Sequence, residues 1–510
     1  MQKWLAVLVS LLLIFLQGVP AQGAGSAWTG GNTGQVPGEL VVKFRTGLSG
    51  TEMAETLRLN RASIKGYIPA LGVKVLRIPA GLESVAAQQL MASGQVLYAE
   101  PNYLAQATYL PNDPYYAGDY QTSRDGRQHQ WALPKVNAPA AWDVTRSLNT
   151  GLLLAIIDTG IDYAHPDLSA KVARDSAGQV LGYNFVANTA DPRDDNGHGT
   201  HVSGIAAAAT DNSTGIAGIS FNSVKIMPIK VLDAAGSGTY SVIVNAIVWA
   251  ADNGARVISM SLGGGSYSQA LQDACNYAWA KGVAIVAASG NDGRKTISYP
   301  GGNNHVLAVG ASDEQDAIAS FSNWGIDVGF AAPGVHILST MPTYDVNLTT
   351  ASGFYKNYDS LSGTSMATPF VGGLAAMLLA QNPSQSNVWA LQQIQRTADN
   401  VSGTANGGWN IHYGYGRINA ANAVTNSLRP ATVGSFYGQV VNQAGLPVSS
   451  ATVTAGGLSY KTGSNGMFRL ANLPAGNYTV TAKTARYGTA SVNAAITSGA
   501  DVILTVRTPK

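Results

Sequence analysis

The sequence predicts an α/β fold with a doubly wound, mostly parallel sheet, preceded by a small α+β domain and followed by a β-sandwich. Between residues 151 and 400, short apolar runs alternate with helical patterns. Strands that are apolar on both faces and separated by helices are typical of a parallel sheet covered on both sides. The chain has 510 residues, of which 45% are hydrophobic and 12% charged, so it is not a disordered chain.

The central region contains the elements of this sheet. We expect its strands at 152–157, 225–231, 256–260, 283–287 and 306–309. Apolar residues at helical spacing between and after these strands predict helices at 200–209, 240–251, 269–280 and 366–381. In such a sheet, reactive groups collect at the carboxyl ends of the strands.

The regions on either side have different patterns. The region 37–106 predicts a small α+β unit, with strands at 39–44, 73–78 and 96–99 and helices at 51–59 and 82–92. The region 434–507 alternates short strand patterns with turns such as Ser464-Asn465-Gly466, which is typical of a small β-sandwich. We therefore divide the chain into a signal peptide, a propeptide, a central domain and a C-terminal domain at 1–21, 22–107, 108–430 and 431–510.

The first 21 residues have the features of a secretory signal peptide. Lys3 is followed by an apolar run over 4–16 and by the small residues of Val19-Pro20-Ala21. This run is shorter than the about 20 residues needed to span a bilayer. We therefore expect a secreted, extracellular protein that is not held in a membrane once the signal is removed. The single cysteine, Cys275, cannot form an internal disulfide and is expected in the core.

The charge distribution excludes one class of partner. Lys plus Arg number 31 and Asp plus Glu 29, and no run of five or six basic residues occurs, so we expect no nucleic-acid binding. The charges are nevertheless unevenly distributed. Residues 431–510 carry six basic residues and one acidic residue, whereas 109–430 are acidic overall. This asymmetry could dock the C-terminal region on the central domain or on an acidic polymer.

Polar residues occur where the apolar elements of the central region begin or end. Asp158 directly follows the run Ala155-Ile156-Ile157, His198 lies between glycines at the start of a helix, and Ser365 starts another apolar helix. A serine hydroxyl needs a base within hydrogen-bond reach, and that base needs a carboxylate to fix its tautomer. Asn291, after another strand, could donate to an oxyanion together with the backbone N–H of Ser365. These residues predict nucleophilic catalysis by serine.

Each of these residues also has a simpler interpretation. A lone Asp or Ser at such a position is commonly a turn or capping residue. His198 and His201 could be metal ligands, but the zinc protease pattern needs a Glu after the first His and a spacing of four, and both are absent. The alternative from another class is a binding or adhesion protein built on an inactive protease fold. The joint presence of Asp158, His198, Asn291 and Ser365 argues against it.

The motifs around these residues resemble those of the subtilisin family of serine endopeptidases, the subtilases, and in particular the thermitase-like branch. They span about 109–425 and read Ile157-Asp158-Thr159-Gly160, His198-Gly199-Thr200-His201-Val202-Ser203-Gly204, Ser259-Met260-Ser261-Leu262-Gly263-Gly264 and Gly363-Thr364-Ser365-Met366-Ala367-Thr368-Pro369. The chain order Asp–His–Ser is also the order in subtilisin. The resemblance implies an endopeptidase that hydrolyses protein peptide bonds through an acyl-enzyme. His198 would be its base, and His201 would be structural.

The same resemblance implies where a substrate binds. Two segments, Gly236-Ser237-Gly238 and Ser261-Leu262-Gly263, would pair with an extended peptide as neighbouring strands. The pocket for the side chain before the scissile bond would be lined by Ala288, Gly290 and Ser298, and Tyr240 would border a more distant apolar pocket. The expected partners are protein or peptide substrates, and we expect a monomer.

Two further regions resemble known modules. Residues 37–106 resemble the inhibitory prosegment of the family, so the chain would be an inactive precursor with its own prosegment as intramolecular inhibitor. The tail at 103–107 would lie in the active site after self-cleavage, with a new N-terminus near Thr108. Residues 434–507 resemble carboxypeptidase-regulatory-like β-sandwich modules, on the basis of Gly438-Gln439-Val440, Pro447-Val448 and Gly466-Met467-Phe468.

Three separate segments resemble the pieces of the family's high-affinity calcium site. Six oxygen ligands are appropriate to Ca²⁺. They would come from the side chains of Asp113, Asp167 and Asn212 and from the carbonyl groups of Ala209, Thr214 and Ile216. The resemblance therefore implies a structural calcium ion.

Overall fold

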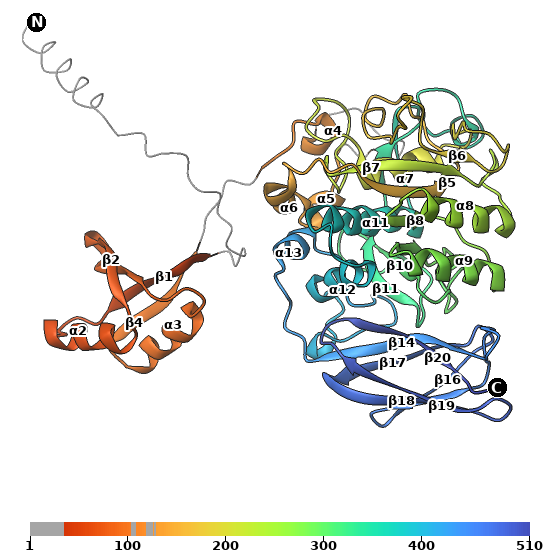
Figure 1. The fold of residues 1–510 in the computed structure, drawn as a ribbon. Helices are drawn as coiled ribbons and strands as arrows, with labels where there is room; N and C mark the ends of the chain where they lie inside the picture. Colours follow the sequence, from red (N-terminus) through yellow and green to blue (C-terminus); the bar gives the residue numbers. More distant parts are fainter. Residues whose placement is uncertain (1–34, 104–108, 119–125, 127–128) are drawn as a thin grey trace, which may run out of the picture. The chain divides into compact units, whose positions relative to one another are not determined.

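The computed structural model describes residues 35–103, 109–118, 126 and 129–510, and it divides the chain into two compact units, 1–105 and 106–510 (Figure 1). The predicted signal peptide and the predicted processing site near Thr108 lie outside the described residues. Within the described ranges, a search for helices that could cross a membrane finds none.

The N-terminal unit is a four-stranded antiparallel sheet that shares one apolar cluster with two helices. Its strand order is β2-β3-β1-β4. The elements are β1 (Gln35–Phe44), α2 (Gly50–Leu59), β2 (Ser63–Ile68), β3 (Val73–Arg77), α3 (Glu83–Ala92) and β4 (Val96–Tyr103). The sequence did not predict β2. Five of its six residues are exposed, so no alternation of apolar and polar residues marks it.

The central domain is built on a seven-stranded sheet whose paired strands are all parallel, in the order β11-β10-β9-β8-β5-β7-β6. The strands are β5 (Leu152–Asp158), β6 (Tyr183–Asn184), β7 (Val224–Lys230), β8 (Val257–Met260), β9 (Ala284–Ala288), β10 (Leu307–Ser312) and β11 (Val328–Pro333). All five predicted strands are present, and the predicted α/β fold class is confirmed. The sequence missed β6, which has two residues, and β11, whose Gly and Pro weaken the strand signal.

Both faces of this sheet are covered by helices. Leu154 and Ile156 of β5 pack in one core with α6, α7, α11, α12 and α13, whereas Ala155 and Ile157 pack in a second core with α8 and α9. Alternating side chains of one strand therefore face opposite layers. The helices are α4 (Pro114–Ala117), α5 (Ala132–Lys135), α6 (Ala138–Thr145), α7 (His198–Ala207), α8 (Tyr240–Asp252), α9 (Gln269–Ala280), α10 (Asn347–Ala351), α11 (Thr364–Gln381), α12 (Asn387–Thr397) and α13 (Ala420–Thr425), with a hairpin of β12 (Ile337–Thr340) and β13 (Tyr358–Leu361).

The C-terminal region is a β-sandwich of a three-stranded sheet, β17-β14-β20, and a four-stranded sheet, β16-β15-β18-β19. Its strands are β14 (Val433–Val441), β15 (Thr452–Ala455), β16 (Leu458–Lys461), β17 (Met467–Pro474), β18 (Gly476–Thr484), β19 (Gly488–Ile496) and β20 (Asp501–Arg507). Every residue of β14 is buried, because one face lies in the sandwich core and the other packs on the central domain. There Tyr437 joins the central core, and its hydroxyl donates to Asp327 Oδ1 at 2.9 Å.

Candidate active site

Asp158 ends strand β5 at the carboxyl edge of the central sheet, as the sequence predicts. Its side chain is 1% exposed. The Oδ1 atom accepts hydrogen bonds from the backbone N–H of Thr159 at 2.8 Å and from His198 Nδ1 at 2.7 Å. The buried carboxylate therefore holds one tautomer of the imidazole, with the proton on Nδ1 and the lone pair on Nε2.

His198 is the first residue of helix α7, and its side chain is 22% exposed. The residue before it, Gly197, has φ of 114°, a conformation that side chains rarely adopt. Burial lowers the pKa of His198, but the negative charges of Asp158 and Asp194 more than offset this, so its pKa lies above the ordinary value. An imidazole with this pKa can exchange a proton near neutral pH.

Ser365 is the second residue of helix α11, at the turn that the sequence predicts. Its Oγ donates to the backbone carbonyl of Ser261 at 3.1 Å, and Ser261 Oγ donates to the carbonyl of Ser365 at 2.7 Å. Among the hydrogen bonds of the described residues, none joins Ser365 to His198. The structure thus brings base and acid into contact but turns the hydroxyl toward a competing acceptor. Catalytic hydrogen bonds commonly tighten only when substrate is bound.

Asn291 follows strand β9 and reaches the turn that starts α11. Its Oδ1 accepts hydrogen bonds from the N–H and the hydroxyl of Thr364, at 2.8 and 2.9 Å. Because Oδ1 accepts both bonds, the Nδ2 group of the Asn291 amide can donate to a substrate. It lies next to Gly363, where an added Cβ would be 3.5 Å from Nδ2. The N–H of Ser365 belongs to the first helical turn, which has no intrahelical partner. Two donors are therefore available at this turn.

A cavity of about 430 Å³ lies beside His198. It is lined by seven of the ten predicted substrate-binding residues, namely Gly236, Ser237, Gly238, Tyr240, Ser261, Leu262 and Gly263. The sequence missed other residues of its wall, including Leu232, Leu348 and Leu361. Leu348 lies on the short helix α10, which belongs to none of the recognised motifs, so no sequence signal points to it.

The other three predicted substrate-binding residues, Ala288, Gly290 and Ser298, do not line this cavity. Ala288 ends β9, and the chain at Ser298 passes close to two glycines. A Cβ on Gly290 would meet Ser298 Oγ at 2.5 Å, and one on Gly263 would meet Ser298 Cβ at 2.6 Å. The structure therefore brings Gly263, Gly290 and Ser298 together, and only glycine fits at the first two positions.

Two of the predicted calcium ligands, Asp113 and Asp167, are fully buried carboxylates. Burial raises the pKa of each to about 6, although both accept hydrogen bonds that lower it. No Lys or Arg of the described residues forms a salt bridge with either one. Asn212 links the pair, because its Nδ2 donates to Asp167 Oδ1 at 2.9 Å and its N–H points to Asp113 Oδ1 at 3.4 Å. Two buried anions without a cation fit a bound metal ion.

The described residues contain no group of three or more His, Cys, Asp or Glu that could hold a metal. The predicted ligand set does not need such a group, since it combines two carboxylates with an amide and carbonyl groups.

Two other residues, His201 and Cys275, have structural positions, as predicted. Burial lowers the pKa of His201 to about 3, and burial raises the pKa of Cys275, a core residue, to about 12. Neither is poised to react near neutral pH.

Comparison with known proteins identifies the family. A sequence model described as the subtilase family matches residues 149–416, more than half of the chain. The chain belongs to the subtilase family. Two further models match this subtilase, the fervidolysin N-terminal prodomain over residues 25–102 and the carboxypeptidase regulatory-like domain over 435–508.

Similar proteins with known activity support the same assignment. The subtilase is 42% identical over 390 residues to a thermophilic serine proteinase of Bacillus sp. (strain AK1), covering 76% of this chain and 88% of that protein. It is 44% identical over 316 residues to thermitase of Thermoactinomyces vulgaris, covering 62% and 99%. A solved structure of a Pseudoalteromonas arctica PAMC 21717 protease matches with 29% identity and a TM-score of 0.53, over 63% of this chain and all of that one. The protein is a serine-type endopeptidase with a prodomain.

Proposed function

We propose that this subtilase is a secreted endopeptidase in which Asp158, His198 and Ser365 form the catalytic triad. The observation that carries the proposal is the 2.7 Å contact between His198 Nδ1 and the buried Asp158 carboxylate, beside a cavity at the strand ends. This contact leaves Nε2 as the only basic atom of the ring. Ser365, at the start of helix α11, carries the hydroxyl that would act as nucleophile. Nucleophilic catalysis requires such a hydroxyl together with the base.

The reaction begins when the Ser365 hydroxyl rotates away from the Ser261 carbonyl and transfers its proton to His198 Nε2. Its oxygen then attacks the substrate carbonyl carbon. Asp158 stabilises the imidazolium that forms, and Asn291 Nδ2 with the N–H of Ser365 binds the oxyanion. His198 then gives the proton to the leaving amine, and water hydrolyses the acyl-enzyme by the same steps in reverse.

The substrate is an extended peptide that lies between two backbone segments, 236–238 and 261–263. Three glycines in these segments leave room for a peptide backbone to approach and pair as a strand. The prodomain acts as an intramolecular inhibitor until the chain cleaves itself near Thr108, and the signal peptide directs secretion. Protein substrates reach the mature enzyme outside the cell.

The pH dependence of casein hydrolysis tests this proposal. We expect kcat/KM to fall as the pH decreases through the raised pKa of His198, because a protonated imidazole cannot accept the serine proton. The midpoint should lie above the ordinary histidine value of about 6.5. His201 stays neutral in this range and should not contribute. Absence of hydrolysis, or a rate that is constant from pH 5 to 8, would refute the assigned base.

We also propose that Ca²⁺ is held by Asp113, Asp167 and Asn212 with the carbonyl groups of Ala209, Thr214 and Ile216. The two buried carboxylates support this, and a flip of the Asn212 amide would turn its oxygen toward the ion. The ion would neutralise both charges and tie the segment at 113 to the loop 209–216. Its role would be structural, since these residues are not part of the proposed triad.

Removal of calcium is expected to lower the melting temperature by roughly 5 °C, from a stabilisation of about 4 kcal/mol at saturating ion. The measurement is calorimetry with and without chelator, on protein inactivated with a fluorophosphonate so that it cannot digest itself. The Asp167→Asn variant should melt lower and respond little to chelator. Asp175→Asn, in an exposed loop, should respond like the wild type. An unchanged wild-type melting temperature would rule out a stabilising ion.

A further inference from the structure

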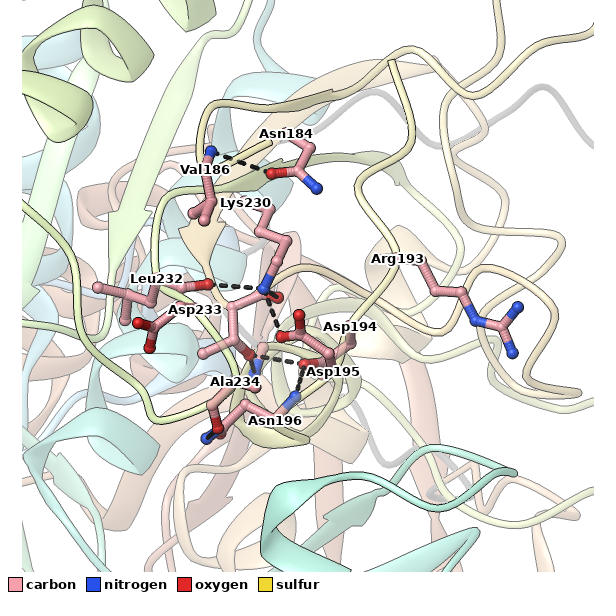
Figure 2. Close-up of polar contacts among 12 residues, drawn as sticks. Asn184, Val186, Arg193, Asp194, Asp195, Asn196, Lys230, Leu232, Asp233 and Ala234 are labelled. Carbon is pink, nitrogen blue, oxygen red and sulfur yellow. Dashed lines mark hydrogen bonds and ion pairs between the residues drawn. The ribbon is translucent and has the colours of Figure 1, made fainter. Parts of the chain in front are cut away.

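Another buried carboxylate lies close in sequence to His198: Asp194, which is 1% exposed and is labelled in Figure 2. Its two oxygens accept five hydrogen bonds. Oδ1 accepts from Thr159 Oγ1 at 2.8 Å, Asn196 N at 3.0 Å and Gly197 N at 2.9 Å. Oδ2 accepts from Thr200 N at 2.9 Å and Thr200 Oγ1 at 2.6 Å. An ionised carboxylate suits this position because it accepts on both oxygens and donates nothing.

These bonds help to satisfy the start of helix α7, which has no side-chain cap of its own because its N-cap residue is Gly197. The first three N–H groups of a helix need acceptors from outside it. Here His198 N donates to Asn196 Oδ1 at 3.1 Å and Gly199 N to Thr159 Oγ1 at 2.8 Å, while Thr200 N donates to Asp194. The first N–H groups of the helix that carries the base therefore donate either to Asp194 or to side chains of residues that are hydrogen-bonded to Asp194.

The same carboxylate is tied to the strand that carries the acid. Thr159 directly follows Asp158, and its hydroxyl donates to Asp194 while accepting from Gly199. The carbonyl of Thr159 is held from the other side by the buried ammonium of Lys230 at 2.8 Å. Lys230 also donates to Leu232 O and Asp195 Oδ1, both at 2.6 Å (Figure 2). The residues next to Asp158 and His198 are thus fixed to one common group.

We propose that Asp194 is a positioning residue that sets the geometry of the Asp158–His198 pair by joining the end of strand β5 to the start of helix α7. This inference rests on the proposed triad and deepens it. Asp194 touches neither the imidazole nor the substrate cavity, so it acts through Thr159 and through the first turn of α7. A loss of its bonds lets the strand end and the helix start shift relative to each other.

An ordinary helix cap would account for the bonds to Thr200 but not for the bond to Thr159. A capping residue stabilises one helix, whereas Asp194 connects two elements that each carry a catalytic group. Its negative charge also raises the pKa of His198, together with that of Asp158. A positioning role therefore predicts a slower chemical step, which loss of a cap alone does not. Loss of the Asp194 charge should in addition shift the pH profile.

The test is the Asp194→Asn variant, in which one acceptor oxygen becomes a donor. We expect kcat per folded molecule to fall about 10²-fold, the scale of a roughly 1 Å misplacement at an active site, while KM changes less than threefold. We also expect the acid limb of kcat/KM to move to lower pH, because the pKa of His198 decreases. The assay uses the mature protein produced from the full-length chain and a peptide p-nitroanilide, with the folded fraction measured by tryptophan fluorescence.

The matched control is Asp175→Asn, because Asp175 Oδ1 also accepts two backbone N–H groups, at 2.9 Å each, but lies in an exposed loop. It should retain the wild-type kcat. If Asp194→Asn does not fold or does not mature, Thr159→Val removes the bridging hydroxyl at similar volume and should lower kcat about tenfold.

The outcomes separate the two proposals. A folded Asp194→Asn protein with a kcat within twofold of wild type and an unchanged pH profile would show that Asp194 is only a helix cap. A Thr159→Val protein with wild-type kcat would contradict the connection to the strand. If the wild type itself has no turnover, the proposed function fails, independently of Asp194.

Discussion

Replacement of Ser365 by Ala is expected to abolish both casein hydrolysis and self-cleavage. For the corresponding change in subtilisin the measured loss in kcat is about 10⁶-fold, and that value sets the scale here. The loss is this large because the other hydroxyl at the start of α11, that of Thr364, donates to Asn291 Oδ1 at 2.9 Å and does not replace the nucleophile. The expected product is an uncleaved precursor, seen by intact mass and N-terminal sequencing of the secreted protein.

Ser362→Ala is the matched control for this variant. Ser362 lies three residues earlier, and its Oγ accepts the N–H of His336 at 2.8 Å. This control should mature and hydrolyse casein. A processed, active Ser365→Ala protein would mean that another residue is the nucleophile, and the mechanism proposed above would be wrong.

The second large effect is expected at Arg469, in the contact between the sandwich and the central domain. Its guanidinium forms a salt bridge with Asp501, and both side chains are 1% exposed. Its Nε donates to the carbonyl of Ile326 at 2.6 Å, and the group lies over the rings of Trp409 and Tyr437 at 4.5 and 4.6 Å. Asp501 in turn accepts from Tyr415 OH at 3.2 Å and Gln395 Nε2 at 3.0 Å, both in the central domain.

Arg469→Ala is therefore expected to destabilise the folded protein by about 3 to 5 kcal/mol, because it leaves the Asp501 carboxylate buried without its cation. For a chain of this size the melting temperature should fall by roughly 5 °C. The measurement is calorimetry on fluorophosphonate-treated protein. Arg486→Ala, an exposed arginine of the same sandwich, should melt within about 1 °C of the wild type. Equal melting temperatures for the two variants would show that this contact contributes little.

This interface also bears on the charge asymmetry between the C-terminal and central domains. Of the six basic residues of the C-terminal region, Arg469 is buried at the contact, where its bonds are specific and short-range. Lys461 and Lys483 instead flank Thr452 in the four-stranded sheet, which does not contain β14. At the contact itself, the two domains are joined by apolar packing and by this buried ion pair.

The sequence was sufficient to place Asp158, His198 and Asn291, because Asp158 ends a strand, His198 begins a helix and Asn291 lies in the turn after a strand, and periodicity marks these elements clearly. The carboxyl ends of parallel strands meet at one edge, so residues far apart in the chain were expected to lie together. The direction of the Ser365 hydroxyl could not be predicted. It depends on the nearby carbonyl of Ser261, a competing acceptor that no motif reveals.

Two other features depend on tertiary contacts that have no pattern in the sequence. Leu348 lines the cavity because the N–H groups of Asn347 and Leu348 donate to the carbonyls of Asp195 and Asn196, which holds α10 beside the base. In the sequence, Asp194 is one of three neighbouring acidic residues, with Asp191 and Asp195, that could form a second metal site next to His198. Its importance appears only when the five donors around it are counted.

The central claim is that His198 activates the hydroxyl of Ser365, although in the structure this hydroxyl donates to Ser261. The most direct measurement is the site and stoichiometry of fluorophosphonate labelling of the mature wild-type protein, mapped by peptide mass. Labelling requires an activated serine. We predict one label per chain, at Ser365. No labelling, or a label on a different serine, would contradict the claim.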